Sequence, residues 1–271
     1  MRLRSALAML LTLSLALGSA VCSTMAWSQA GVPEVITIKL SLSNVHVIRG
    51  SRSVLIDAGG KDDLPALEAA LTAHGIGWID LAAVIVTHGH SDHAALAAEI
   101  RRRSGAAVLL GSGDLPMAAA GHNDNLRPTN FTARVLKQFF IDPAYQAFAP
   151  DLVIDGDIDL RRFGIAGVVR QMPGHTPGSL VVLLDDGRAF VGDMVLGGWM
   201  GGAVFADRAG EHYFQADLAR NRANIVELLR GPTQTFYLGH GGPVTRASVL
   251  QGFGLDDPLA TRTSRLESAR R

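Results

Sequence analysis

The chain has 271 residues, enough for one large domain or two small ones, and its 48% of apolar residues allows a substantial core. Global disorder is excluded by this composition. The 25 basic and 25 acidic side chains balance, so charge gives no reason to expect nucleic acid as the main partner.

The first thirty residues are typical of a secretory signal peptide. Arg2 and Arg4 precede the mainly apolar run 6–17, which is too short to span a bilayer. Ser28-Gln29-Ala30 fits a small-x-small cleavage site, and Gly18-Ser19-Ala20 is a second candidate. We therefore predict an exported protein, periplasmic or secreted, with no stable membrane insertion after cleavage.

The lone cysteine, Cys22, lies inside this predicted signal peptide. Cleavage after Ala30 leaves a mature protein without disulfides, thiolate metal ligands or a cysteine nucleophile. Lipid attachment at Cys22 is disfavoured because the preceding residue, Val21, is bulky. The predicted organisation is a signal peptide over 1–30, one folded domain over 31–255 and a polar tail over 256–271.

Apolar periodicity predicts alternating strands and helices along the chain. Strands are predicted at 35–40, 45–49, 53–57, 81–87, 106–110, 151–154, 165–171, 180–184, 189–191 and 235–238. Helices are predicted at 63–74, 92–103 and 215–230, with a further helix from Thr245. The two clusters of strands, with helices after some of them, predict two packed sheets with helices outside. Periodicity alone leaves the topology open.

Two segments carry side chains whose role the sequence leaves open. Segment 111–150 is rich in Gly, Asn, Pro and aromatic residues, and it either contacts substrate or forms a helical cover that packs its own aromatics. The glycine-rich run 197–202 is predicted to be a mobile loop, in which Trp199 and Met200 either line a pocket or pack inward. Four loop side chains are further candidates for substrate contact: His122, Tyr145, His212 and Tyr213.

A dense group of metal-ligand side chains follows the predicted strand 81–87, in the motif Thr87-His88-Gly89-His90-Ser91-Asp92-His93. Because alternate residues of an extended segment point the same way, His88 and His90 can reach one metal. Asp92 and His93 follow where a helix begins and can face a neighbouring position. Imidazole and carboxylate bind divalent cations such as zinc, so the motif predicts a metal site.

Further ligand candidates lie beside three other predicted strands. His175 lies in Pro173-Gly174-His175-Thr176-Pro177-Gly178, Asp193 follows strand 189–191, and His240 follows strand 235–238. Neighbouring glycines allow the backbone to turn sharply at a crowded centre. Strand ends are also where site residues gather in layered α/β folds.

In this order, the motifs around His88, His175, Asp193 and His240 resemble those of the metallo-β-lactamase superfamily. The turn Asp57-Ala58-Gly59 also resembles one that precedes the metal motif in that superfamily. The resemblance extends from about Val35 to Thr245. It implies an α/β fold, the αββα four-layer sandwich, with a di-metal site along one edge.

The resemblance also implies a role for each candidate residue. Each metal would have three ligands of its own: His88, His90 and His175 for one, and Asp92, His93 and His240 for the other. Asp193 would bridge both metals, and Asp57 would orient ligands by hydrogen bonds, with a plain turn-capping role as the alternative. The cofactors implied are two divalent ions, zinc in the first place, with iron or manganese as alternatives.

Two such metals about 4 Å apart can hold one hydroxide between them, because metal binding lowers the pKa of water to about 7. We predict a hydrolase in which this hydroxide attacks the carbonyl of an ester, thioester or lactone, with Asp92 helping to orient it. Asp193 at the bridging position resembles glyoxalase II-type thioesterases and lactonases. β-Lactam-cleaving enzymes usually carry another residue there, so β-lactamase is the second choice, and phosphodiesters stay open.

Other classes of function share this fold. An iron-dependent persulfide oxygenase is an alternative, but a mononuclear iron enzyme would not need all seven ligands. A binding protein that kept the fold is disfavoured by the intact ligand set. The predicted partner is a small-molecule substrate, and the sequence indicates neither nucleic acid nor a particular oligomeric state.

Overall fold

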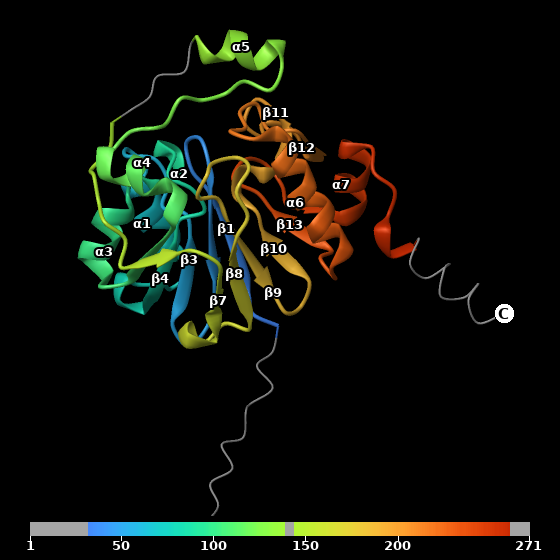
Figure 1. The fold of residues 1–271 in the computed structure, drawn as a ribbon. Helices are drawn as coiled ribbons and strands as arrows, with labels where there is room; N and C mark the ends of the chain where they lie inside the picture. Colours follow the sequence, from blue (N-terminus) through green and yellow to red (C-terminus); the bar gives the residue numbers. More distant parts are fainter. Residues whose placement is uncertain (1–31, 139–143, 261–271) are drawn as a thin grey trace, which may run out of the picture. The chain divides into compact units, whose positions relative to one another are not determined.

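The computed structural model describes residues 32–138 and 144–260 (Figure 1). The predicted signal peptide with Cys22, the end of the predicted tail and residues 139–143 lie outside the described residues. Within the described ranges, no helix is both long enough and apolar enough to cross a membrane.

The first sheet has six strands that lie side by side in chain order: β1 (Val35–Lys39), β2 (Asn44–Ile48), β3 (Ser53–Ile56), β4 (Leu81–Ile85), β5 (Ala107–Gly111) and β6 (Leu152–Ile154). Strands β1 to β3 are antiparallel and joined by short turns. Strands β3 to β6 are parallel, which requires longer connections, and each connection contains helices. The parallel strands therefore end at the same edge of the sheet.

The second sheet has the order β14-β13-β10-β9-β8-β7. Its strands are β7 (Asp157–Asp159), β8 (Gly167–Gln171), β9 (Leu180–Leu184), β10 (Arg188–Phe190), β13 (Thr235–Tyr237) and β14 (Val244–Thr245). Only β10 and β13 pair in parallel among these described strands, and a long helix lies in the connection between them. Strands β7 and β14 were not predicted.

Helices cover the outer faces of both sheets. The α-helices are α1 (Leu64–Ala73), α2 (Ser91–Ala94), α3 (Ala97–Ser104), α4 (Leu115–Ala120), α5 (Phe131–Lys137), α6 (Leu218–Arg230) and α7 (Arg246–Phe253). Short 3₁₀ helices are η1 (Trp78–Asp80), η2 (Ser112–Asp114), η3 (Leu160–Phe163) and η4 (Gly192–Met194). Helices α1 and α3 lie beside the first sheet, and α6 and α7 lie beside the second (Figure 1).

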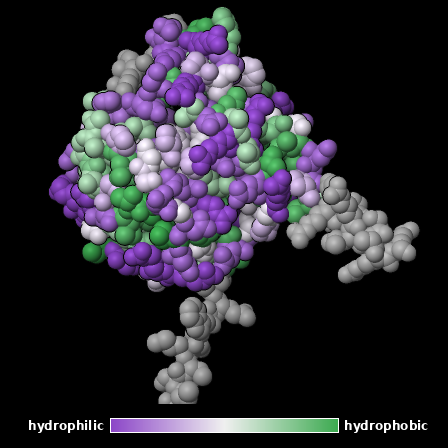
Figure 2. All heavy atoms as spheres, viewed as in Figure 1, coloured by the Kyte–Doolittle hydropathy of each residue, from purple (hydrophilic) through white to green (hydrophobic). Residues whose placement is uncertain are grey.

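Three apolar clusters separate the four layers. In β3, Val54 and Ile56 belong to the central cluster between the sheets, while Leu55 belongs to the cluster under α1 and α3. In β9, Val182 belongs to the central cluster and Val181 to the cluster under α6 and α7. This alternation follows from the two-residue period of a strand. The face shown in Figure 2 is mainly hydrophilic, with apolar side chains in scattered groups. The predicted αββα four-layer sandwich is confirmed.

The helix predicted over 92–103 is two helices, α2 and α3. The carbonyl of His93 accepts a hydrogen bond from the Ala58 amide at 2.7 Å. That carbonyl therefore does not hold Ala97 in a continuous helix, in which it would accept the Ala97 N–H. Because of this break, α2, which carries Asp92 and His93, does not have to follow the direction of the packed helix α3.

The prediction of a loop over 197–202 is wrong for residues 197–199, which lie in a strand, whereas 200–202 form a turn. This run belongs to a hairpin of β11 (Leu196–Trp199) and β12 (Val204–Gly210). Its glycines allow close backbone approach, because a Cβ on Gly198 would lie 2.1 Å from the Val204 carbonyl oxygen. Trp199 is 69% exposed and Met200 is 77% exposed, so neither packs inward.

Different parts of segment 111–150 fit the two roles considered for it, which are a cover that packs its own aromatic residues and a border of the site. Tyr145 and Phe148 are buried in the cluster under α1 and α3, as expected of a cover that packs its own aromatics. Phe131 in α5, by contrast, is 77% exposed. Residues 124–127 of the same segment lie at the candidate site described below.

Candidate metal centre

The motif Thr87–His93 begins where β4 ends and is fixed to both sheets. The Thr87 amide donates to Asp57 Oδ1 at 2.6 Å, and the Leu180 amide donates to the Thr87 carbonyl at 2.7 Å. His90 has an extended backbone at the start of α2, with φ −69° and ψ 150°. The change from extended chain to helical turn points the side chains of the motif in two directions.

The first group of candidate ligands is His88, His90 and His175. Their ligand nitrogens all lie within 4.8 Å of one another, and all three side chains are buried. His90 Nδ1 is 3.1 Å from His175 Nε2. The loop between β8 and β9 thus brings His175 from the second sheet to the end of β4 in the first.

The second group is Asp92, His93 and His240. His240 Nε2 is 3.2 Å from Asp92 Oδ2 and 3.4 Å from His93 Nε2. His93 is fully buried, whereas the Asp92 side chain is 22% exposed. His240 follows β13, so this group also combines both sheets.

Asp193, in η4 after β10, lies between the two groups. Its Oδ2 atom is 3.8 Å from His88 Nε2 and 3.7 Å from His175 Nε2. The same atom is 3.3 Å from His240 Nε2, and Oδ1 is 3.5 Å from His93 Nε2. The structure therefore brings all seven predicted ligand side chains together, with Asp193 between the two groups.

The cluster is suitable for metal binding. Four ligands around one zinc ion at 2.0–2.2 Å are about 3.3–3.6 Å apart, and the measured distances between neighbouring atoms, 3.1–3.8 Å, lie around this range. Among the described residues, the buried atoms His88 Nε2 and Asp193 Oδ1 have no hydrogen-bond partner. Unpaired buried polar atoms destabilise a fold, and a cation would pair with both.

Asp57 organises two of the candidate ligands. Its Oδ2 atom accepts hydrogen bonds from His93 Nδ1 at 2.9 Å and from the Thr87 hydroxyl at 3.0 Å. The Thr87 oxygen then accepts from His88 Nδ1 at 3.0 Å. Both histidines are thereby held with Nε2 toward the cluster, as ligand histidines usually are. Asp57 itself has a left-handed backbone, with φ 65°.

Asp57→Asn is expected to weaken metal binding about 10- to 100-fold, because an amide nitrogen placed at Oδ2 cannot accept from His93. Competition with a chromophoric chelator measures the affinity. Asp62→Asn is the matched control, since the Asp62 side chain is 83% exposed. An unchanged affinity in Asp57→Asn would leave Asp57 with a turn-capping role only.

Burial lowers the pKa of His88 and His175 well below the usual value, so both imidazoles are neutral and offer a lone pair. Burial acts in the same direction on His240, but the Asp193 and Asp92 carboxylates outweigh it and raise its pKa to about 10. The carboxylates of Asp92, Asp193 and Asp57 likewise outweigh burial at His93 and raise its pKa. Without a metal, the second group therefore holds protons at neutral pH.

Zinc binding to the metal-free protein at pH 7 is expected to release protons from His240 and His93. Because a raised pKa means that metal and proton compete, affinity should rise as pH increases toward about 10 and fall as the solution is acidified. Calorimetric titrations in two buffers of different protonation enthalpy measure the release. A binding heat that is the same in both buffers would contradict it.

Two aspartates at the site were missed by sequence reasoning. Asp114 Oδ2 accepts from the Gly89 amide at 2.9 Å and from the Thr176 hydroxyl at 2.7 Å, so it ties together the loops that carry the histidines of the first group. Asp124 Oδ1 lies 3.2 Å from His90 Nε2, and this hydrogen bond lowers the pKa of Asp124. Asp114 closely follows a predicted strand, which was an available signal; no pattern marks Asp124.

Of the four side chains considered for substrate contact, the structure brings His212 into the cluster. It is buried, and its Nε2 is 3.2 Å from Asp193 Oδ2. Burial lowers its pKa, so the imidazole is neutral. His122 is exposed, and the Tyr145 hydroxyl donates to the Gly89 carbonyl at 2.8 Å behind the motif.

A narrow hollow opens at the first ligand group. It is lined by His90 and His175, by residues 124–127 and by residues 214–216. Part of segment 111–150 therefore borders the candidate site, and substrate contact by that part stays a prediction.

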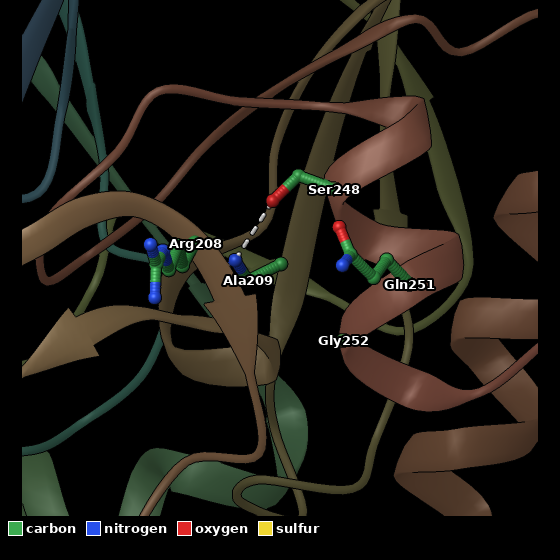
Figure 3. A pocket seen from close by; sticks show the side chains of 5 residues that line it. All are labelled: Arg208, Ala209, Ser248, Gln251 and Gly252. Carbon is green, nitrogen blue, oxygen red and sulfur yellow. Dashed lines mark hydrogen bonds between the residues drawn. The ribbon is translucent and has the colours of Figure 1, made fainter.

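A second hollow, of about 450 Å³, lies between β12 and α7 (Figure 3). It is lined by Arg208, Ala209, Ser248, Gln251 and Gly252. The Ala209 amide donates to the Ser248 hydroxyl across it at 2.9 Å. None of the candidate ligands lines this hollow, so it is separate from the metal-binding cluster.

Comparison with known proteins defines the family. A family model for the metallo-β-lactamase superfamily matches residues 38–240, well over half of the chain. Hydroxyacylglutathione hydrolase of Anaeromyxobacter dehalogenans (strain 2CP-C) is 32% identical over 154 residues, which are 56% of this chain and 44% of that protein. The probable metallo-hydrolase YflN of Bacillus subtilis (strain 168) is 29% identical over 226 residues, which are 77% of this chain and 84% of that protein.

Solved structures share the fold. Rm3 metallo-β-lactamase superposes with a TM-score of 0.57 at 21% identity, covering 88% of this chain and 92% of that one. BJP-1, a subclass B3 metallo-β-lactamase of Bradyrhizobium japonicum, gives a TM-score of 0.56 at 16% identity, covering 89% and 94%. Identities this low establish a common fold and not a common substrate.

The chain belongs to the metallo-β-lactamase superfamily. The prediction of a metal-dependent hydrolase of that superfamily is thereby confirmed at the level of class. The match spans less than half the length of the hydroxyacylglutathione hydrolase, so it does not assign that protein's reaction to this chain.

Proposed function

We propose that the protein is an exported dinuclear zinc hydrolase that cleaves an ester, thioester or lactone bond of a small molecule. The observation that carries this proposal is the position of Asp193. Its Oδ1 atom is 3.5 Å from His93 Nε2 of the second ligand group. Its Oδ2 atom lies within 3.8 Å of His88 and His175 of the first group and 3.3 Å from His240 of the second. A carboxylate between two complete sets of ligands is the arrangement expected of a two-metal hydrolase.

Divalent ions held by these groups would supply a hydroxide at neutral pH and polarise the substrate carbonyl. Asp92 is the side chain suited to orient the nucleophile, because it is partly exposed within the cluster. Although burial raises the pKa of Asp92, His93 and His240 outweigh burial and lower it. Asp92 is therefore a carboxylate at neutral pH, able to accept a hydrogen bond from the nucleophile.

The rim of the site supports a carbonyl substrate with an apolar part. Beside His240, the carbonyl of Leu42 accepts a hydrogen bond from the His240 Nδ1 atom at 2.8 Å, while the Leu42 side chain is 61% exposed. On the β11–β12 hairpin, the Gly197 amide donates to the His240 carbonyl at 2.9 Å, and the exposed Trp199 and Met200 follow. Apolar side chains left in water at a site rim are suited to an acyl group.

Elemental analysis of protein purified without added metal tests the proposal first. Two zinc ions per chain, followed by hydrolysis of thioesters, lactones or esters in a substrate panel, would support it. A single iron ion with oxygen consumption on a persulfide would contradict it and favour the oxygenase alternative. Hydrolysis of β-lactams alone would favour the β-lactamase alternative.

Export is the part of the proposal that rests on sequence alone. Residues 1–30 have the charged start, short apolar run and small-residue site of a signal peptide. Amino-terminal sequencing of protein recovered from outside the cytoplasm should begin at Gly31. Full-length protein confined to the cytoplasm would overturn this part and leave the hydrolase proposal standing.

A further inference from the structure

His212 is a buried histidine at the cluster that the seven-ligand set does not use. It lies between β12 and α6, 19 residues after Asp193 in the chain and far from every motif that marks the site. Its Nε2 atom, His175 Nε2 and one Asp193 oxygen all lie within 4.8 Å of one another. His212 therefore forms a third group of possible ligands with His175 and Asp193, and neither predicted ligand group includes it.

The orientation of His212 repeats that of a candidate ligand. His175 Nδ1 is 2.9 Å from the Phe214 carbonyl oxygen, and His212 Nδ1 is 3.1 Å from the same oxygen. A carbonyl can only accept, so both contacts are hydrogen bonds when the proton is on Nδ1, and in that tautomer each ring turns its Nε2 lone pair toward Asp193. Ligand histidines characteristically donate their other ring nitrogen to a backbone carbonyl in this way.

The backbone holds the two rings in a fixed relation. The Ala216 amide donates to the His175 carbonyl at 2.9 Å, and the Asp217 amide donates to the Gly174 carbonyl at 2.8 Å. The Thr129 hydroxyl donates to the His212 carbonyl at 3.0 Å from the other side. The segment that carries His212 is therefore fastened to the loop that carries His175.

The distances match those between the other candidate ligands. His212 Nε2 is 3.2 Å from Asp193 Oδ2, shorter than the 3.7 Å from His175 Nε2 to that atom. A lone pair facing a carboxylate oxygen at this separation is repulsive unless a cation lies between them. We infer that His212 is an eighth protein ligand of the metal centre, bound through Nε2 on the side formed by His175 and Asp193. The inference rests on the proposed metal centre and extends it.

A competing role is a hydrogen bond from His212 to Asp193. It would require the other tautomer, in which Nδ1 accepts from the Phe214 amide, 3.3 Å away, and Nε2–H donates to the carboxylate. Glutamine separates the two roles, because its amide can still donate a hydrogen bond but is a poor zinc or cobalt ligand. His212→Ala and His212→Gln therefore form the test pair.

The experiment measures metal binding and not turnover. Zinc affinity is determined by chelator competition, and the visible spectrum of the cobalt(II)-loaded protein reports the ligands directly. We expect both variants to bind the more weakly held metal ion about 100-fold less tightly. This is the upper end of the range of affinity losses seen when a residue that only orients a ligand is replaced. Added imidazole should restore the cobalt spectrum of His212→Ala, since it replaces the missing ring. His74→Ala, an exposed histidine at the end of α1, should behave as wild type.

Each other result overturns the inference in a distinguishable way. An unchanged affinity and cobalt spectrum in His212→Ala would show that His212 is no ligand, while the proposed function would stand. Loss in His212→Ala with retention in His212→Gln would assign the hydrogen-bonding role. A wild-type protein that binds neither zinc nor cobalt would overturn both this inference and the proposed function.

Discussion

Replacing Asp193 with asparagine is expected to leave the protein folded, to lower its metal content below two ions per chain and to reduce kcat/KM for hydrolysis on the order of 1000-fold. Asparagine keeps the volume of the buried side chain but offers one acceptor oxygen where the carboxylate offers two. The variant also removes the negative charge that faces five histidine nitrogens within 3.8 Å. Both losses act on the two ligand groups together.

Metal analysis and hydrolysis of the substrate found in the panel measure these effects, and thermal unfolding checks the fold. Asp155→Asn, at an exposed position between β6 and β7, is the control and should load both ions. If Asp193→Asn kept two ions and full activity, Asp193 would have no bridging role. If the combination His88→Ala with Asp193→Ala kept both as well, the whole site would be assigned wrongly.

The sequence was sufficient to predict the ligand cluster because its signal is local. His88, His90, Asp92 and His93 lie within six residues, and their two directions follow from a strand that runs into a helical turn. His175, Asp193 and His240 each lie beside turn glycines close to a strand end. Strand ends of neighbouring strands meet at one edge, which made these residues candidates for one site, and the resemblance to the superfamily divided them into two ligand groups.

The residues that support the cluster were less accessible to sequence reasoning because their role depends on tertiary contacts. Asp114 acts by accepting hydrogen bonds from two loops far apart in the chain, and Asp124 acts through one ring nitrogen of His90. His212 owes its orientation to the Phe214 carbonyl, which it shares with His175. A single polar residue in a loop gives no periodicity and no spacing from which such contacts follow.

In the fold, too, some features follow from the local sequence and others depend on tertiary contacts. The four layers follow from alternating apolar residues, which the sequence displays directly. The break between α2 and α3 depends on the Ala58 amide, which takes the His93 carbonyl out of the helical ladder. The β11–β12 hairpin was hidden by its glycines, which indicate mobility in general but here permit close contact with Gly241: a Cβ on Gly202 would lie 2.3 Å from the Gly241 nitrogen. In both cases a distant backbone group decides the local structure.

Gly239→Ala is expected to disrupt metal loading and hydrolysis without any change to a ligand. A Cβ at this position would lie 2.1 Å from Asp193 Oδ1 and 2.6 Å from the Cε1 atom of His93. Neither neighbour is free to yield, because the His93 ring donates to Asp57 and Asp193 lies among five histidines. The methyl group must displace the carboxylate, so the two oxygens lose their positions between the ligand groups. Overpacking of this kind also lowers the free energy of unfolding by about 1–3 kcal/mol.

Gly210→Ala is the matched control, because a Cβ there meets no atom within 4 Å. The pair separates the cost of a methyl group in general from its cost at the cluster, since both variants make the same chemical change. Elemental analysis and hydrolysis assays should show Gly210→Ala as wild type and Gly239→Ala as depleted in metal, with thermal unfolding confirming that both are folded. A Gly239→Ala protein with two tightly bound ions would mean that the space beside Gly239 does not limit the position of Asp193. Because Gly239 precedes His240 directly, the expected result would also explain why a glycine stands at this point of the chain.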